Sequence, residues 1–423
     1  MPLVKMAIPS KAVVLLCLAL SVISSTAKSV SFSALSGIPN PATQHLQAKI
    51  HQEWNNFKAK YGKIYATEEE DNSRMLAYLS HKEMVDKHNQ KYDRGEVSFK
   101  VKTHRFSDLT SAEKEQKRSL ASIQESRPDN IMFRPPLNAE IPESLDWRDY
   151  GFVTDVRNQE KPKYCASCYA FSAIAALEGQ YKRTTGKLVS MSDQNIVDCS
   201  REFGSFGCDQ GLVEGSYDYI MANGGIDTRE SYPYTGVEAS CKYNESSKVP
   251  DLKVTGYVWI PEGDEEALKW AVATQGPISV ATEMPLRFFD YEEGVFYEPR
   301  ACNSNVLAHA MLLVGYGTDP KQGDYWLIKN SLGKEWGEEG YMRLARNRGN
   351  HCLIATQALY PLLSSRPICD PSQPVKRGRP LKTDSQPPNT LASGRTTSRP
   401  KSNRDRSYFF ERVLIRPEAV LSD

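Results

Sequence analysis

Cys168 is the residue whose surroundings in the sequence are best suited to chemistry. A thiol acts as a nucleophile in its thiolate form, and a helix N-terminus lowers the pKa of a thiol through its free N–H groups and its dipole. Cys168 stands directly before a stretch with a helical apolar stripe. The stripe consists of Ala170, Ile174, Leu177 and Tyr181. The sequence therefore predicts a reactive thiol where a loop enters a long helix.

A thiol nucleophile also needs a base and a group that orients the base. The chain has seven histidines, and His309 stands at the start of a run, Met311 to Tyr316, that predicts a strand. Asn330 follows a second predicted strand, Tyr325 to Ile328, and could hold the imidazole. For Cys168 taken alone the alternative is an inert buried thiol, which is common for free cysteines. The separated blocks that contain Cys168, His309 and Asn330 together favour a nucleophilic role for Cys168.

These blocks resemble the papain-like cysteine proteases, and more narrowly their cathepsin L-like branch. That family carries Cys-Gly-[Ser/Ala]-Cys-[Trp/Tyr], with His and Asn about 130–150 residues downstream. Cys165 to Tyr169 fits except for Ala166, and His309 and Asn330 follow at about the right distance. The resemblance covers roughly residues 50–363. It implies an α+β fold with two lobes, one helical and one like a β-barrel, preceded by a small helical prodomain.

The resemblance also implies a role for each site residue. Cys168 is the nucleophile, His309 its acid/base partner, and Asn330 the residue that holds the imidazole. Gln159 is the oxyanion-hole side chain, acting with the backbone N–H of Cys168, because amide donors stabilise a tetrahedral oxyanion. The residues expected at the substrate cleft are Gly211, Leu212, Val213, Ala281, Leu307, Ala310, Trp336 and Gln357.

Six of the nine cysteines match structural positions of the family. Six cysteines allow fifteen pairings on spacing alone. The resemblance selects Cys165–Cys208, Cys199–Cys241 and Cys302–Cys352. Zinc binding is the competing interpretation, but Cys165 and Cys168 form a lone CxxC with no second pair to face it, so no metal and no cofactor are expected. Asn244 is the only N-glycosylation acceptor.

Several positions depart from the family pattern. Three extra residues lengthen the segment from Glu160 to Tyr164, which rims the leaving-group side; a longer loop there resembles cathepsin X, a carboxypeptidase. Leu332 stands where the family has a Trp that shields the Asn–His hydrogen bond, and Tyr169 replaces a second Trp. Ala166 and Gln210 depart as well. These substitutions keep open an alternative, a catalytically weak or inactive papain-like binding protein.

The stretch before the enzyme resembles the prosegment of cathepsin L-like zymogens. Six residues fall on one helical face: Glu70, Arg74, Tyr78, His81, Val85 and Asn89. His104, Phe106 and Asp108 resemble the second prosegment motif. A helical inhibitor unit of about residues 50–109 is therefore expected to dock on the enzyme. Protonation of its carboxylates is expected to release it at acid pH.

The chain begins like a secretory protein. Lys5 and Lys11 precede a twelve-residue apolar run, and Ser25 and Ala27 resemble a cleavage site. Twelve residues are too few to span a membrane core, which needs about 20. The expected organisation is a signal peptide over 1–27, a propeptide over 28–138, a peptidase domain over 139–363 and a basic, Pro-rich, disordered tail over 364–423. Within the propeptide, 28–49 is expected to be loose and 110–140 to be a linker.

Composition limits the possible partners. The chain has 53 Lys+Arg against 52 Asp+Glu, so bulk electrostatics do not favour nucleic acid. The tail motif from Lys376 to Pro380 resembles an AT-hook core, but a solvated basic linker is the preferred interpretation. The sequence thus predicts a secreted or lysosomal cysteine endopeptidase, made as a zymogen and working through an acyl-enzyme. Expected partners are protein or peptide substrates and the chain's own propeptide, with a monomeric enzyme and no membrane contact.

Overall fold

A computed structural model describes residues 41–116, 132–136 and 140–364. The expected signal peptide, part of the expected linker, and the tail with Cys369 and the Lys376 to Pro380 motif lie outside the described residues. Among the residues that are described, no helix combines the length and the apolar character that crossing a membrane would require.

The residues up to Asp71 form a compact unit of their own. Helix α2 runs over Pro41–Tyr61. The Trp54 ring stacks on Phe57 with 5.4 Å between centroids, and its Nε1–H donates to Asp71 Oδ2 at 3.0 Å. The expectation of a loose segment up to residue 49 was wrong from Pro41 onward, because proline fits the first turn of a helix, where its missing N–H has no intrahelical partner.

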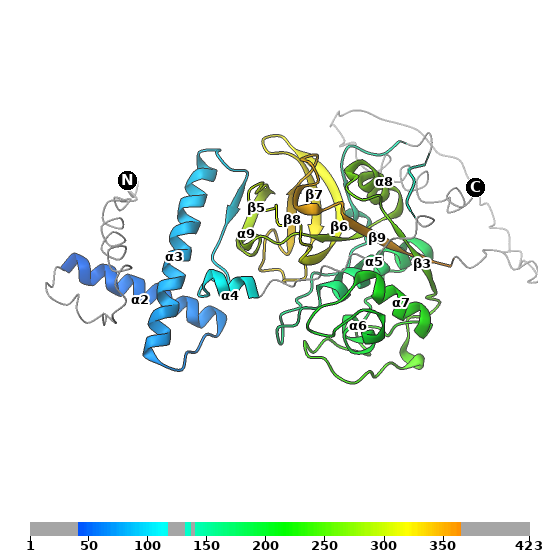
Figure 1. The fold of residues 1–423 in the computed structure, drawn as a ribbon, viewed down its shortest axis with the longest axis horizontal. Helices are drawn as coiled ribbons and strands as arrows, with labels where there is room; N and C mark the ends of the chain where they lie inside the picture. Colours follow the sequence, from blue (N-terminus) through cyan, green and yellow to red (C-terminus); the bar gives the residue numbers. More distant parts are fainter. Residues whose placement is uncertain (1–40, 117–131, 137–139, 365–423) are drawn as a thin grey trace, which may run out of the picture. The chain divides into compact units, whose positions relative to one another are not determined.

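The rest of the expected prosegment belongs to the second unit, with the expected peptidase domain. Helix α3 spans Glu68–Asp93, and it buries Tyr78, His81 and Val85 from the predicted face. Strand β1, Phe99–Val101, follows and pairs antiparallel with the enzyme strand β5, Tyr291–Phe296 (Figure 1). A short helix α4, Ser111–Gln116, occupies part of the expected linker.

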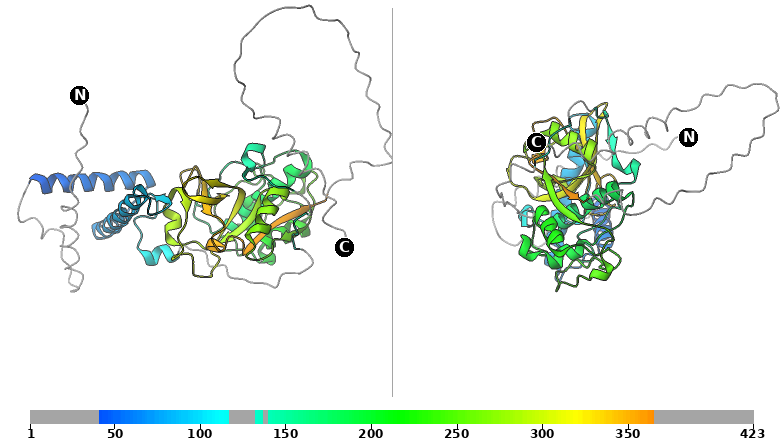
Figure 2. Two further views of the ribbon diagram at one scale, coloured as in Figure 1. Left: turned by 90° about the horizontal axis from the view of Figure 1, so that it is seen from above. Right: turned by 90° about the vertical axis from the view of Figure 1, so that its right-hand side faces the viewer.

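The helical lobe is built around the helix that starts at the predicted nucleophile. Helix α5 runs over Cys168–Thr185, and all four residues of its apolar stripe are buried. Helices α6, Asp193–Cys199, and α7, Val213–Asn223, pack beside it (Figure 1 and Figure 2). Disulfides Cys165–Cys208 and Cys199–Cys241 cross-link this lobe, the second from the last residue of α6.

The second lobe is a mainly antiparallel sheet with strand order β1-β5-β8-β7-β6-β4-β9-β3, in which only the β5–β8 pair is parallel. The remaining strands are β2 Leu145–Asp146, β3 Val254–Trp259, β4 Ile278–Thr282, β6 His309–Asp319, β7 Gly323–Lys329, β8 Tyr341–Ala345 and β9 Gln357–Leu363. Helices α8 (Glu265–Gln275) and α9 (Leu286–Asp290) and the 3₁₀ turns at 147–150, 201–203, 245–247 and 351–353 complete the enzyme. The predicted strands near residues 277–281, 311–316 and 325–328 are confirmed as β4, β6 and β7.

The two lobes meet where α5 packs on β6 and β9. Ser172 on α5 donates to the carbonyl of Met311 on β6 at 2.6 Å. Strand β6 begins at His309, and β7 ends one residue before Asn330. Because β6 and β7 are antiparallel neighbours, with Leu312 opposite Lys329, the start of one lies beside the end of the other. The predicted α+β fold with a helical and a β lobe is confirmed. It places Cys168, His309 and Asn330 near the junction of the lobes.

We predict that Gly315→Ala destabilises this junction. A Cβ on Gly315 would lie 2.1 Å from the carbonyl oxygen of Leu145, a backbone atom that cannot move aside cheaply. Overpacking of this kind costs about 1–3 kcal/mol. The urea midpoint of the variant should fall measurably, while that of Val237→Ala, at a position that is 42% exposed, should stay near wild type. An unchanged midpoint in Gly315→Ala would contradict this account of the β2–β6 contact.

Candidate active site

The structure places Cys168 at the first residue of α5, as the sequence predicts. The preceding loop is held by the Cys165–Cys208 disulfide and by Ala166 N–H, which donates to the Cys208 carbonyl at 2.8 Å. Ser167 Oγ lies 2.9 Å from the Tyr234 hydroxyl. The three disulfides are the pairs that the resemblance implies, and within the described ranges Cys168 is the one free cysteine.

Cys168 is 7% exposed. Burial raises its pKa, and the backbone N–H groups of Ala310, Tyr169 and Cys168 itself act in the opposite direction. The helix N-terminus therefore favours the thiolate, but the desolvation of the buried thiol outweighs it. A nearby cation is needed to tip the balance toward thiolate.

His309 is oriented by Asn330. His309 Nε2 lies 2.8 Å from Asn330 Oδ1, and the same oxygen accepts from the Ser331 N–H at 2.7 Å. An amide oxygen only accepts, so Nε2 carries the proton and Nδ1 keeps a lone pair. Burial lowers the pKa of His309 to about 4, which the bond to Asn330 partly opposes. The ring is therefore a neutral base with its free nitrogen available for a thiol proton.

The cover over His309 comes from α9. Phe288 meets the imidazole edge-on at 6.1 Å, and Trp336 stacks on Phe288 at 5.4 Å. The Trp336 Nε1–H donates to the Phe288 carbonyl. Leu332 is partly buried, and Asn330 Nδ2 is buried with no hydrogen-bond partner in the described part of the chain. An aromatic shield on the imidazole thus persists although the family Trp is replaced by Leu332.

Gln159 is held firmly beside the nucleophile. Its Nε2 donates to the Cys165 carbonyl at 3.1 Å, and its Oε1 accepts from Ser331 Oγ at 2.6 Å. Its backbone carbonyl accepts from the Tyr234 hydroxyl at 2.7 Å. One amide hydrogen of Gln159 remains for an oxyanion. Sequence reasoning missed Ser331, which contacts both Gln159 and Asn330; its only signal was its place directly after Asn330.

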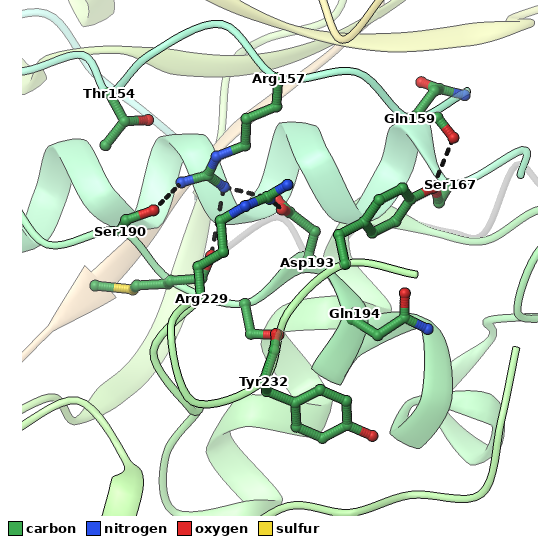
Figure 3. A network of polar contacts seen from close by, with 12 residues as sticks. Thr154, Arg157, Gln159, Ser167, Ser190, Asp193, Gln194, Arg229 and Tyr232 are labelled. Carbon is green, nitrogen blue, oxygen red and sulfur yellow. Dashed lines mark hydrogen bonds and ion pairs between the residues drawn. The ribbon is translucent and has the colours of Figure 1, made fainter. Parts of the chain in front are cut away.

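A buried ionic network lies behind the Gln159 loop and was also missed. Arg157 bonds to Glu178, and it donates to Asp193 and Ser190 at 2.8 Å each (Figure 3). Arg229 pairs with Asp193 from the other side. Lys329, the residue before Asn330, donates to the Thr154 carbonyl at 2.8 Å, and burial lowers its pKa to about 7. The network ties the two lobes together directly behind the site.

Cys168 and His309 line one cleft of about 560 Å³. Seven of the residues expected at the substrate cleft also line it: Gly211, Leu212, Val213, Ala281, Leu307, Ala310 and Gln357. Trp336 is instead buried against Phe288. Glu214 lines the cleft too and was not anticipated, although it directly follows Val213. The cleft is therefore a mainly apolar pocket with two side-chain amides, Gln210 and Gln357, and one carboxylate, Glu214, in its lining.

Prosegment histidines contact the enzyme on α9. His81 Nε2 and His104 Nε2 lie 2.8 and 2.9 Å from the same oxygen of buried Asp290. Arg287 Nη1 lies 2.6 Å from His88 Nδ1, and His88 Nε2 lies 2.9 Å from the Phe99 carbonyl. Burial alone would raise the pKa of Asp290, but its bonds from His104 and His81 hold that pKa below its usual range.

The hydrogen bonds define the protonation of these rings. A guanidinium only donates and a carbonyl only accepts, so His88 must be neutral, with its proton on Nε2. His104 Nδ1 accepts from the Phe106 N–H at 3.4 Å, so its proton also lies on Nε2, which is 2.9 Å from Asp290 but lacks hydrogen-bond geometry. A metal on the His81–His104–Asp290 cluster would displace that proton to Nδ1, where a donor already points, so hydrogen bonding fits the cluster better than a metal.

Comparison with known proteins gives a consistent result. Residues 141–362 match the model of the papain family cysteine proteases, and residues 54–113 match the cathepsin propeptide inhibitor domain. A cathepsin L-like peptidase of Aedes aegypti is 44% identical, covering 74% of this chain and 94% of that protein. Human cathepsin L2 is 42% identical over 76% of this chain and 95% of that protein. The structure of digestive procathepsin L 3 from Tenebrio molitor aligns with a TM-score of 0.66 at 35% identity. The alignment covers 74% of this chain and 99% of that one.

We predict that the prosegment contact weakens as pH falls because of its histidines. Arg74, on the helix face that was expected to dock on the enzyme, bonds instead to the carboxylate of Glu113 within the prosegment. Burial lowers the pKa of His88 and of His104 in the docked form, so docking is favoured above the ordinary histidine pKa of about 6.5 and lost below it. Lys114, near Asp290 and Asp108, adds a further positive charge against imidazolium.

The measurement is hydrogen exchange of α3 and β1 in the full-length Cys168→Ala chain between pH 4.5 and 7.5. Protection should be lost on acidification in that chain. It should persist to a pH about one unit lower when His88→Asn and His104→Asn are added, because Asn does not titrate. His45→Asn, at an exposed position, is the matched control. Identical profiles for the double variant and its parent would refute the histidine account.

Proposed function

Because the chain belongs to the papain family of cysteine proteases and is a zymogen with an inhibitory propeptide, we propose that Cys168, His309, Asn330 and Gln159 perform the hydrolysis. We also propose that the enzyme is an endopeptidase of the lysosome or the extracellular space. The observation that carries the assignment is the neutral imidazole of His309, fixed on Asn330 and lining the same cleft as the thiol at the start of α5.

The reaction follows from these positions. The Cys168 proton moves to His309 Nδ1, and the imidazolium and thiolate then stabilise each other, which offsets the desolvation of each. The thiolate attacks the peptide carbonyl, and the free N–H of Gln159 and the Cys168 backbone N–H stabilise the oxyanion. His309 protonates the leaving amine, which leaves a thioester. His309 then takes a proton from water, which hydrolyses the thioester and returns the thiol.

Cleavage of internal bonds is supported by the lining of the cleft. An exopeptidase must hold a charged chain terminus, and a carboxypeptidase needs a cation for that purpose. The pocket around Leu212 and Gln357 is lined mainly by apolar side chains and suits a substrate side chain rather than a chain terminus. We place the propeptide at about 28–138 and the mature enzyme at about 139–363, so the cleft becomes accessible when the first segment is removed.

We expect Cys168→Ala to abolish hydrolysis of a peptide that is acetylated at one end and amidated at the other. Removing the sulfur removes the covalent step, while the small buried side chain leaves α5 intact. Cys369→Ala is the matched control and should retain full activity. Turnover by Cys168→Ala near the wild-type rate would refute the nucleophile, and cleavage restricted to peptides with a free terminus would refute the endopeptidase.

We expect the pocket to prefer Leu, Val or Phe two residues before the scissile bond, because its walls are aliphatic. Gln357→Ala should sharpen that preference, since the amide at the pocket base can pair with polar tips. Glu214→Gln should lower kcat/KM for Arg at this position several-fold relative to Leu, because a carboxylate holds a guanidinium. Glu202→Gln, on the exposed surface, is the control. Coincident profiles of all four proteins in a fluorogenic library would place both residues outside the specificity pocket.

A further inference from the structure

Tyr169 directly follows the proposed nucleophile and stands where the family carries a Trp. It is the second residue of helix α5 and is 1% exposed. Its hydroxyl reaches the loop of residues 204–211, where it lies 2.8 Å from Ser205 Oγ and 2.9 Å from the Gly207 carbonyl oxygen. A Trp side chain offers one donor and no acceptor, so it could not make both of these contacts.

The Tyr169 hydroxyl closes a small circuit of hydrogen bonds. A carbonyl only accepts, so the hydroxyl donates to Gly207, and Ser205 Oγ must then donate to the Tyr169 oxygen. Ser205 Oγ in turn accepts from the Gly207 N–H at 3.3 Å. Burial raises the pKa of Tyr169 well above its ordinary value, which the bond with Ser205 partly opposes, so the hydroxyl keeps its proton at neutral and acid pH. Ser205 and Gly207 are buried as well, so this circuit defines the conformation of the loop.

The same loop borders the substrate cleft at Gly211. Ser205 and Gly211 face each other across an antiparallel bridge, and the two hydrogen bonds of the bridge are made by their neighbours in the chain. In this pattern the N–H and the C=O of Gly211 itself point away from Ser205. Gly211 lines the cleft together with Cys168. An extended peptide in the cleft can therefore pair with the backbone of Gly211 as an added strand.

Tyr169 holds both sides of this bridge. A Cβ placed on Gly211 would lie 2.5 Å from Tyr169 Cε2, so the ring is in direct contact with the glycine backbone. The hydroxyl holds the opposite side through Ser205. The Cys165–Cys208 disulfide attaches the loop between these two points. All of these partners belong to the expected peptidase domain, so they remain with Tyr169 when the prosegment is removed.

We propose that Tyr169 is a positioning residue for substrate binding, whose hydroxyl holds the loop of residues 204–211 so that the backbone of Gly211 pairs with the peptide segment before the scissile bond. The inference rests on the proposed endopeptidase and adds a determinant of its affinity for peptides. Because Tyr169 acts through Gly211, loss of its hydroxyl should weaken peptide binding and leave the reactivity of the Cys168 thiol unchanged.

The first test compares mature wild-type enzyme with Tyr169→Phe, which removes only the hydroxyl. The substrate is a peptide blocked at both ends, with Leu two residues before the scissile bond. Because the change removes binding that the ground state and the transition state share, KM should rise roughly tenfold while kcat stays within about twofold of wild type. Alkylation of Cys168 by iodoacetamide, which is too small to use Gly211, should keep its rate and its pH profile. Tyr297→Phe, at a position that is 38% exposed, is the matched control and should leave all of these values unchanged.

The second test alters the substrate. Replacing the N–H of that Leu by an ester oxygen removes the donor that pairs with the Gly211 carbonyl. The replacement should raise KM roughly tenfold in wild type and less than about threefold in Tyr169→Phe, since two changes that act on one contact are not additive. Ser205→Ala removes the other partner of the hydroxyl and should resemble Tyr169→Phe in both tests.

Three results would overturn this proposal and leave the endopeptidase intact. They are an unchanged KM in Tyr169→Phe and Ser205→Ala, an equal penalty for the ester substrate in wild type and Tyr169→Phe, and alkylation of Cys168 that slows as much as peptide turnover. The last result would mean that the hydroxyl only supports the folded structure around the thiol. Failure of wild type to cleave the blocked peptide would instead overturn the endopeptidase, and this proposal with it.

Discussion

The contact between His309 Nε2 and Asn330 Oδ1 is the interaction on which the site depends. It exists because β6 begins and β7 ends at the same place, where β6 meets α5. Ser331 reinforces it, since its N–H donates to the same Asn330 oxygen and its hydroxyl holds Gln159. The base, its orienting group and the proposed oxyanion donor are thus one hydrogen-bonded unit. Burial keeps the Cys168 thiol and the His309 imidazole neutral in this structure. Each becomes charged only when the thiol proton moves to the imidazole.

Helix α9 links that unit to the control of the zymogen. Its Phe288 covers the imidazole, while Arg287 and Asp290 on the same five-residue helix contact the prosegment histidines. Departure of the prosegment therefore removes hydrogen-bond partners from the element that shields the proposed catalytic base, His309. The Arg105–Glu160 ion pair makes a second link, because Arg105 belongs to the prosegment and Glu160 directly follows Gln159. Inhibition by the prosegment and the proposed catalysis both depend on these contacts. Substitutions on α9 should therefore alter both.

Local patterns in the sequence predicted the elements that carry the site. The start of α5 at Cys168, the strand after His309 and the strand before Asn330 follow from periodicity and from branched residues, and motif spacing brought those blocks together. What the sequence could not give are pairings between distant polar residues. Nothing near Asp290 indicates two histidines about 200 residues earlier, and nothing near Arg157 indicates Glu178 and Asp193. Pro41 was misjudged because composition alone suggested a loose segment, although proline suits the first turn of a helix.

The most direct test of the account is labelling of the chain by a peptidyl epoxide, with the modified residue located by mass spectrometry. The account predicts one equivalent of label, on Cys168, after the prosegment is removed at acid pH. It also predicts little labelling at neutral pH in the intact zymogen, where the thiol is buried and neutral, and labelling slowed by at least an order of magnitude in Asn330→Ala. Equal rates for zymogen and mature enzyme, or label on any residue other than Cys168, would contradict it.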